Sequence, residues 1–336
     1  MIALNAFEKL ATPSEASAVN CLALHAQGLS RRYGKHWAVK NVDICLPQRQ
    51  VLGFLGPNGA GKTTTLQMLT GNLAPHSGSV SLCGVDLIRA PQKAKSHLGY
   101  LPEIAPLYKE LRVTEYLRWV ARLHRIPRAL EAHAIDQALE RCKLTTVSTT
   151  LIAHLSKGFQ QRVGIAQAII HEPDVIILDE PTVGLDPNQI RDIRTLIREL
   201  GQTHSLIIST HLLSEVEAVC DAVLIMHQGD MVFNDTLERF NQNALNPCYR
   251  LVRFEKIPPF TELPQGLPFK TLYCVAPHLF YVRFLEAIEP QTHYTQCTQW
   301  ALESGLGPIH LYPEIKTLEA LFSALTPPPP EHRVSP

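Results

Sequence analysis

The stretch at residues 56–64, which reads GPNGAGKTT, constrains this chain more than any other, because it matches the phosphate-loop pattern G-x-x-x-x-G-K-[ST]. An apolar run at 51–55 precedes it and predicts a buried strand, and residues 63–69 predict the helix that the loop feeds. Glycines let the backbone wrap closely around an anion, and the loop N–H groups then face the phosphates together with the positive end of the helix. The chain is therefore expected to bind a nucleotide.

Each residue of this loop is expected to contribute to nucleotide binding. Lys62 adds a positive charge near the β- and γ-phosphates, and the Thr63 hydroxyl is placed to ligate Mg²⁺. The loop therefore predicts a nucleoside triphosphate and Mg²⁺ as cofactors. The complete set of expected loop contacts is Gly56, Pro57, Asn58, Gly59, Ala60, Gly61, Lys62, Thr63 and Thr64.

Composition limits the alternatives. A chain of 336 residues suggests two domains, or one large domain with an appendage. The formal net charge is zero and there is no long basic run, so no nucleic-acid partner is expected. The eight cysteines are scattered without a C-x-x-C pair, which argues against a zinc site or a disulfide framework and fits a reducing cytosol. No segment approaches 18 uninterrupted apolar residues, so we expect no membrane span and no signal peptide.

The hydrophobic pattern predicts an α/β organisation. Short apolar stretches between Cys21 and Pro47 predict an antiparallel sheet of modest strands, and residues 79–84 predict another strand. The pattern is helical from about 90 to 153, with the clearest amphipathic pieces at 113–123 and 130–142. Continuous apolar runs then predict strands that are buried on both faces, at residues 175–178, 206–210 and 222–226.

A change in composition near residues 241–247 predicts a small α+β appendage over residues 241–325. Its expected strands are 249–254, 271–275 and 280–284, and its expected helices are 292–304 and 315–325. Residues 1–20 are expected to be a flexible extension, and the proline-rich tail 326–336 is expected to be disordered.

Two further segments are candidates for chemistry. Asp179 ends the apolar run at 175–178 and could hold Mg²⁺, and the adjacent Glu180 could polarise an attacking water. An acidic strand-to-loop turn is the ordinary alternative. Ser156 is a good N-cap for an apolar helix at 163–170, so the stretch at 155–162 could offer a second anion-binding helix end or could be an ordinary capped helix.

In their order along the chain, these features resemble the nucleotide-binding subunit of an ABC transporter, over roughly residues 22–235. The sequence LSKGFQQ at 155–161 resembles the signature motif usually written LSGGQ, which implies roles for Ser156, Lys157 and Gly158. Asp179 and Glu180 match the magnesium aspartate and the catalytic glutamate. The remaining matches are Asp186 in a D-loop, His211 as the switch histidine, Tyr33 as the aromatic residue that stacks on adenine, and Glu103 at the Q-loop.

Two departures from the family pattern point to a subfamily. Lys157 and Phe159 stand where glycine and glutamine are usual in the signature, and Glu103 replaces the glutamine of the Q-loop. Both variants resemble those of a bacterial branch that includes gliding-motility and related export ATPases. Glu103 is therefore expected to approach Mg²⁺ together with Thr63 and Asp179.

The resemblance implies a P-loop NTPase fold of ABC type, with a parallel-sheet core, an antiparallel β subdomain and a helical subdomain at about 90–153, all within residues 21–240. It implies ATP hydrolysis with Lys62, Glu180 and His211 as catalytic residues. The signature of one subunit would close over ATP held by a second copy in a homodimer. A membrane permease on a separate chain would be the other partner, with residues 103–110 nearest to it, and the protein would lie at the cytoplasmic face of the membrane as part of an exporter.

Two other functions remain open at this stage. A soluble ABC-type ATPase acting on ribosomes or DNA usually carries two nucleotide domains or a long coiled-coil insertion, and neither is evident. A non-enzymatic regulatory subunit would not need intact Lys62, Asp179, Glu180 and His211.

Overall fold

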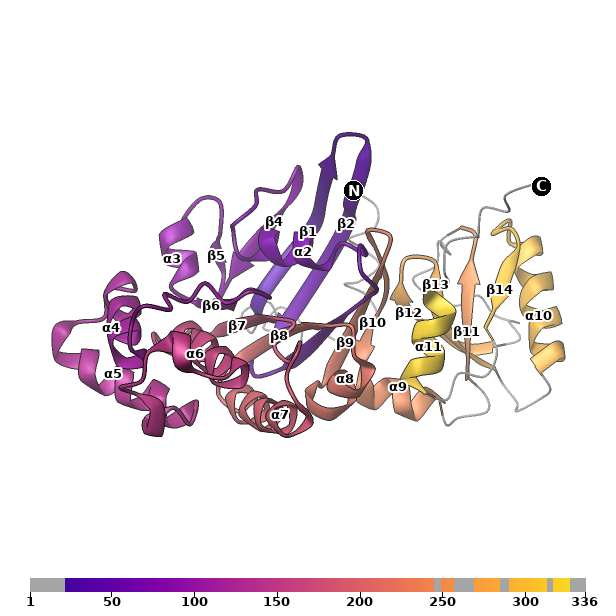
Figure 1. The fold of residues 1–336 in the computed structure, drawn as a ribbon. Helices are drawn as coiled ribbons and strands as arrows, with labels where there is room; N and C mark the ends of the chain where they lie inside the picture. The colour runs from indigo at the N-terminus through magenta and orange to yellow at the C-terminus, as the bar shows by residue number, and fades with distance from the viewer. Residues whose placement is uncertain (1–21, 245–248, 257–268, 285–289, 313–316, 327–336) are drawn as a thin grey trace, which may run out of the picture. The chain divides into compact units, whose positions relative to one another are not determined.

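The computed structural model describes residues 22–244, 249–256, 269–284, 290–312 and 317–326 (Figure 1). The chain divides into two compact units, the first within residues 18–221 and 228–230 and the second within 222–227 and 231–336. The extension expected at 1–20 lies outside the described residues, and so does the expected tail apart from Thr326. In the part of the chain that is described, no helix has the length and apolar character needed to cross a membrane.

An antiparallel sheet opens the first unit, with the strand order β2-β1-β4-β5. Its strands are β1 (Leu22–Tyr33), β2 (His36–Pro47), β4 (Ser77–Leu82) and β5 (Val85–Asp86). The expected sheet is present, but β1 and β2 have 12 residues each and are longer than the modest strands that were predicted. Shifts in their pairing register, one of them between Ala26 and Leu29, absorb irregular residues such as Gly28 without ending the strand.

Four strands of the six-stranded sheet belong to this unit and pair in parallel, in the order β3-β8-β7-β6. They are β3 (Val51–Leu55), β8 (Ser205–Thr210), β7 (Val175–Asp179) and β6 (Leu98–Leu101). Every residue of β3, β7 and β8 is buried, as their continuous apolar sequences predicted. The carboxyl ends of β3, β7 and β8 align, with Leu55 opposite Thr210 and Asp179 opposite Ser209.

Helices cover both faces of this sheet. Figure 1 shows α2 on one side of the strands and α6, α7 and α8 on the other, and α2 contacts β1 and β2 of the antiparallel sheet as well as β7. The helices of the unit are α2 (Lys62–Leu69), α3 (Pro91–Lys95), α4 (Val113–Leu123), α5 (Arg128–Arg141), α6 (Lys157–Ile169), α7 (Pro187–Gly201) and α8 (Leu213–Val219), with short 3₁₀ turns at Thr145–Val147 and Ile152–His154.

The segment at 90–153 is less uniformly helical than predicted, because β6 lies within it and pairs in parallel with β7. Four residues are too few to display a strand periodicity between two helical stretches. A packing constraint fixes the strand's position. A Cβ atom on Gly99 would clash with the backbone of Ala168 in α6, so the glycine allows α6 to approach the sheet closely.

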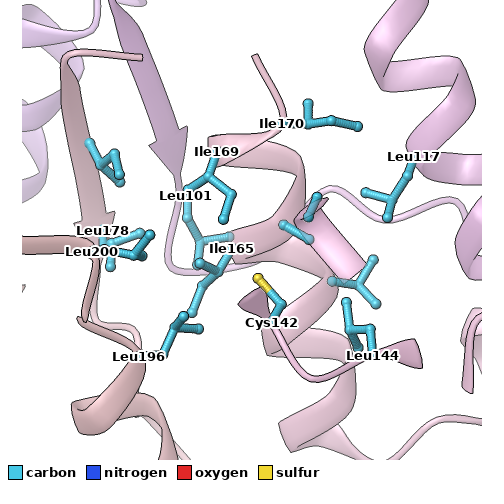
Figure 2. Close-up of a cluster of buried hydrophobic side chains, with 14 of the residues drawn as sticks. Leu101, Leu117, Cys142, Leu144, Ile165, Ile169, Ile170, Leu178, Leu196 and Leu200 are labelled. Carbon is cyan, nitrogen blue, oxygen red and sulfur yellow. The ribbon is translucent and has the colours of Figure 1, made fainter. Parts of the chain in front are cut away.

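The hydrophobic core of the first unit is centred on α6. Figure 2 shows Ile165 and Ile169 of this helix between the strand residues Leu101 and Leu178 and the α4 residue Leu117. Complete burial of each such side chain stabilises the fold by about 1.5–3 kcal/mol relative to exposure. This packing fixes the helix whose first residues are the expected signature motif.

The second unit contains β9 (Ala222–His227), most of β10 (Asp230–Thr236) and an antiparallel sheet in the order β12-β13-β11-β14. The strands of this sheet are β11 (Tyr249–Phe254), β12 (Phe269–Ala276), β13 (Leu279–Phe284) and β14 (Ile309–Leu311), and the helices are α9 (Leu237–Ala244), α10 (Pro290–Glu303) and α11 (Leu318–Leu325). Phe254 and Trp300 meet edge to face in its core, with ring centroids 5.7 Å apart. The sequence pattern does not predict β14, because its three residues, which follow Gly307 and Pro308, are too few to show an alternation.

Candidate nucleotide-binding site

The phosphate loop connects β3 to α2 as the sequence predicted. Gly59 and Gly61 have φ values of 79° and 105°, in the left-handed region that favours glycine. The Lys62 ammonium group is buried and donates to the Gly56 carbonyl oxygen at 2.7 Å. No acidic residue occupies the first turn of α2, so no carboxylate of the helix itself competes with a phosphate for its positive end.

The negative charges of three carboxylates act on the Lys62 ammonium group. Burial lowers the pKa of the Lys62 ammonium group, while the negative charges of Glu180, Asp179 and Glu103 act in the opposite direction. Burial raises the pKa of the Asp179 carboxyl, and the charges of Glu180 and Glu103 add to this effect. Three negative groups against one ammonium leave a surplus of negative charge, which favours a bound cation.

The donors present fit Mg²⁺. The Thr63 hydroxyl and the carboxylates of Asp179 and Glu103 line one pocket, and hard oxygen ligands of this kind are those that Mg²⁺ prefers. Asp179 is held rigidly because it is the last residue of β7 and only 2% exposed. The structure therefore offers a set of oxygen ligands beside the phosphate loop.

Glu180 and His211 form a hydrogen-bonded pair next to this ligand set. His211 Nδ1 lies 2.9 Å from one Glu180 carboxylate oxygen and 3.1 Å from the other. Glu180 has a positive φ of 47°, and its backbone N–H donates to the Ser209 carbonyl oxygen at 2.9 Å. The left-handed backbone turns the carboxylate away from the strand direction of β7, at a conformational cost of about 1–3 kcal/mol. Such strain is typical of functional sites.

One pocket of about 430 Å³ collects most of the predicted site. Two of the predicted residues, Gly56 and Ala60, are in the loop but do not line the pocket. Ala38 and Val183 line the pocket but were not predicted, because a single small apolar residue carries no sequence signal. The predicted residues that line it are Tyr33, Pro57, Asn58, Gly59, Gly61, Lys62, Thr63, Thr64, Glu103, Asp179, Glu180 and His211.

The signature and D-loop residues lie elsewhere and do not line this pocket. Ser156 is the N-cap of α6, where its hydroxyl accepts from the Phe159 N–H at 3.4 Å. The Lys157 ammonium group packs against Gly184, and a Cβ atom on Gly158 would meet the Gln189 side chain. Asp186 caps α7, accepting from the N–H groups of Asn188 and Gln189 at 3.0 Å each.

A buried carboxyl group that the sequence did not indicate connects the loops of Glu180 and His211. Glu215 of α8 is 2% exposed and accepts hydrogen bonds from the hydroxyl groups of Thr182 and Thr210. The Thr210 hydroxyl also accepts from the Leu212 N–H at 3.1 Å. An acidic residue on a short helix is normally a surface residue, so no feature of the sequence indicated that this one is buried.

A phosphate loop, a ligand set for Mg²⁺ and a carboxylate–histidine pair in one pocket define the class of P-loop nucleoside triphosphatases. Comparison with known proteins identifies the family. The family model described as "ABC transporter" matches residues 39–183. The chain is 35% identical over 239 residues to the uncharacterized ABC transporter ATP-binding protein YxlF of Bacillus subtilis. The aligned region covers 71% of this chain and 79% of YxlF.

Two further comparisons agree with this family. The bacitracin transport ATP-binding protein BcrA of Bacillus licheniformis is 37% identical over 222 residues, or 65% of this chain and 72% of BcrA. A solved structure described as "ATP binding subunit of ABC transporter" matches with a TM-score of 0.60 and 30% identity, covering 66% of this chain and 92% of that one. The chain belongs to the ABC transporter ATP-binding proteins, which are ATPases, and the predicted fold class is confirmed.

Proposed function

We propose that this protein is the ATP-hydrolysing subunit of an ABC exporter, and that it couples ATP-driven closure of a homodimer to a separate membrane permease. The observation that carries the proposal is the pocket in which Lys62, Asp179, Glu180 and His211 come together. The export direction is supported by relatives described as bacitracin transport, linearmycin resistance and probable multidrug transporter proteins, which are 31–37% identical.

Each residue of the pocket has a separate task in this proposal. The phosphate loop and Lys62 bind the β- and γ-phosphates, and the exposed ring of Tyr33 stacks on the adenine. Thr63, Asp179 and Glu103 would hold Mg²⁺, which neutralises charge on the phosphates when it is bound. Glu180 orients and polarises the attacking water, while His211 holds the Glu180 carboxylate in place and senses the γ-phosphate.

Ser156, Lys157 and Gly158 lie outside the pocket, and this supports their assignment to ATP held by a second copy of the chain. The two phosphate loops and two signature helices would then enclose two nucleotides. ATP brings the negative charge that helix ends and Lys62 neutralise, so closure is favourable only with nucleotide. Asp186, at the start of α7, would transmit the state of one site to the other. A related cassette of the same fold, MJ0796, has been solved as a dimer.

We assign the nucleotide-binding domain to residues 21–240, with a helical subdomain at about 90–153, and an appended α+β domain to residues 241–325. The segment at 103–110 is the proposed contact with the permease, which would hold the protein at the cytoplasmic face of the membrane. Ile104 and Tyr108 of this segment have exposed side chains, as a docking segment requires. Lys157, Phe159 and Glu103 support placement in the branch that resembles gliding-motility ATPases.

The substitution Glu180→Gln tests the enzymatic part of the proposal. We expect ATP turnover to fall by about 10²–10⁴-fold, because the general base is lost, while ATP binding is retained. With ATP and Mg²⁺, this variant should elute as a dimer in size-exclusion chromatography. Glu217→Gln is the matched control, since Glu217 is exposed on α8.

Unchanged turnover in Glu180→Gln would remove Glu180 from the catalytic role, and a strictly monomeric protein with ATP would contradict the composite site. Affinity purification of the variant from a membrane fraction tests the partner. An integral membrane protein should co-purify in stoichiometric amount. Ribosomes or DNA in its place would overturn the exporter assignment.

A further inference from the structure

Three metal-ligating side chains meet outside the nucleotide pocket. They are Cys83 in the turn between β4 and β5, His97 directly before β6 and Asp174 directly before β7. One donor atom of each, a thiol sulfur, an imidazole nitrogen and a carboxylate oxygen, lies within 4.8 Å of the other two. His97 Nδ1 and Asp174 Oδ2 are 2.6 Å apart.

The fold places all three residues through backbone contacts. Because β6 and β7 pair in parallel with Leu98 opposite Val175, the residues that precede them are neighbours, and the Val175 N–H donates to the His97 carbonyl oxygen at 2.9 Å. The Cys83 N–H donates to the Ala23 carbonyl oxygen at 2.9 Å, which anchors the turn to β1. The fold therefore brings the three residues together without an ion.

This cluster is separate from the nucleotide pocket. Asp179 is the last residue of β7 and Glu103 follows β6, whereas Asp174 and His97 precede the same strands. Strands of four to five residues separate the two ends by about 13–17 Å at 3.3 Å per residue. The cluster thus lies at the amino-terminal edge of the parallel sheet, opposite the phosphate loop.

The chemistry of the cluster argues against a catalytic cysteine. Burial and the neighbouring Asp174 carboxylate raise the pKa of the Cys83 thiol to about 11, so the free thiol keeps its proton at neutral pH and is a poor nucleophile. Among the described residues, His97 is the only basic side chain within 4 Å of the Asp174 carboxylate. The side chains of Asp174 and His97 are 57% and 29% exposed, so an ion can enter from solvent.

We propose that Cys83, His97 and Asp174 form a zinc-binding site that joins the antiparallel sheet to the amino-terminal edge of the parallel sheet. Sulfur, nitrogen and oxygen donors together suit Zn²⁺, whereas Mg²⁺ and Ca²⁺ prefer oxygen alone. Ligands of a tetrahedral zinc lie about 3.3–3.6 Å apart, given metal–ligand distances of 2.0–2.3 Å. His97 Nδ1 and Asp174 Oδ2, which are 2.6 Å apart, reach this spacing if they separate by about 0.7 Å. The Cys83 sulfur lies within 4.8 Å of both donor atoms.

Water completes the coordination, since the cluster supplies three protein ligands. Binding forms a zinc–sulfur bond and releases the Cys83 thiol proton to solvent. If the neutral His97 ring carries its proton on Nδ1 in the free protein, that proton moves to Nε2 when Nδ1 binds zinc, so His97 releases no proton to solvent. One proton is therefore released for each zinc bound. The absence of a C-x-x-C pair argued against a zinc site in the sequence, but here the ligands come from three separate segments.

Titration of the full-length, chelator-treated protein with Zn²⁺ alone, in excess Mg²⁺ and without nucleotide, tests the site. Calorimetry in two buffers of different ionisation enthalpy should give one equivalent of zinc and about one proton released. Zinc should also raise the melting temperature by several degrees, because it binds the folded state. Co²⁺ as a probe should produce a thiolate-to-cobalt charge-transfer band.

Two substitutions identify the ligands. Cys83→Ser should abolish the cobalt charge-transfer band, and Cys83→Ser and His97→Gln should each weaken zinc binding at least about tenfold. Cys45→Ser is the matched control and should leave both signals unchanged, since Cys45 is an exposed cysteine of strand β2 in the same sheet and is not part of the cluster. The proposal is overturned if the wild-type protein shows no cobalt band, or if both variants bind zinc as the wild type does. The wild-type spectrum decides the question even if a variant fails to fold.

Discussion

Replacement of Glu215 by alanine is expected to destabilise the first unit and to slow ATP hydrolysis. Glu215, Thr182 and Thr210 are 2%, 3% and 0% exposed, so water cannot replace a lost partner. A buried hydroxyl without a partner costs about 1–3 kcal/mol, and two hydroxyls lose their acceptor here. With the cavity left by the deleted side-chain atoms, we expect a loss of about 3–5 kcal/mol in the free energy of unfolding.

The isosteric substitution Glu215→Gln should be much milder. An amide keeps one oxygen as an acceptor, and the hydroxyl that faces its NH₂ group can rotate to accept. We therefore expect a cost of about 1 kcal/mol. Glu217→Ala on the exposed face of the same helix is the control and should change stability by less than about 0.5 kcal/mol.

ATP hydrolysis should also slow in Glu215→Ala, because Thr182 follows Glu180 by two residues and Thr210 directly precedes His211. Loosening these loops would misplace the Glu180–His211 pair, and we expect kcat to fall on the order of tenfold to a hundredfold in Glu215→Ala. Urea denaturation followed by circular dichroism measures the stability, and a phosphate-release assay measures turnover.

If the stability of Glu215→Ala lies within about 0.5 kcal/mol of wild type, or if Glu217→Ala is equally destabilising, the buried contacts of Glu215 do not stabilise the unit. A second test uses the triple variant Thr182→Val, Thr210→Val and Glu215→Leu. Removing the carboxylate and both hydroxyls together should recover much of the lost stability, because none of these three buried groups is then left without its partner. The Leu212 N–H loses Thr210 as its acceptor, but Leu212 is an exposed residue and water can replace the hydroxyl. The triple variant should not recover turnover.

Three further predictions follow from the site and the core. Glu103→Gln should raise the Mg²⁺ concentration for half-maximal turnover roughly tenfold, or about 1.4 kcal/mol, and an unchanged Mg²⁺ requirement would remove Glu103 from the ligand set. Burial and the stacked His124 lower the pKa of His171 to about 4. The unfolded chain, with a pKa of about 6.5, then binds a proton more readily than the folded state. The contribution of His171 to stability is therefore complete above about pH 6.5 and is lost as the pH falls towards 4. His171→Phe should flatten that part of the pH–stability curve by up to about 3 kcal/mol, and an unaltered curve in urea denaturation would show that His171 is not responsible. Gly99→Ala should cost at least about 3 kcal/mol in the same assay, because the new Cβ atom meets the Ala168 backbone, and a neutral result would contradict the close contact of α6 with β6.

The sequence by itself determined the features that depend on contiguous residues. The phosphate loop needs its glycines and lysine at fixed spacing between one strand and one helix, and β3 and α2 occupy the expected residues. The strand that ends at Asp179 and the helix capped by Ser156 are equally local, since each is set by an apolar run and one polar residue at its end. Such elements could be predicted without knowing their neighbours.

Only the tertiary structure decided which distant residues meet. Glu180 and His211 are 31 positions apart, and their hydrogen bond exists because the ends of β7 and β8 align in the parallel sheet. Local sequence gave no sign that Glu215 faces the interior, or that β6 forms a strand within a helical stretch. Burial and register depend on what packs against a segment, so they are properties of the assembled fold.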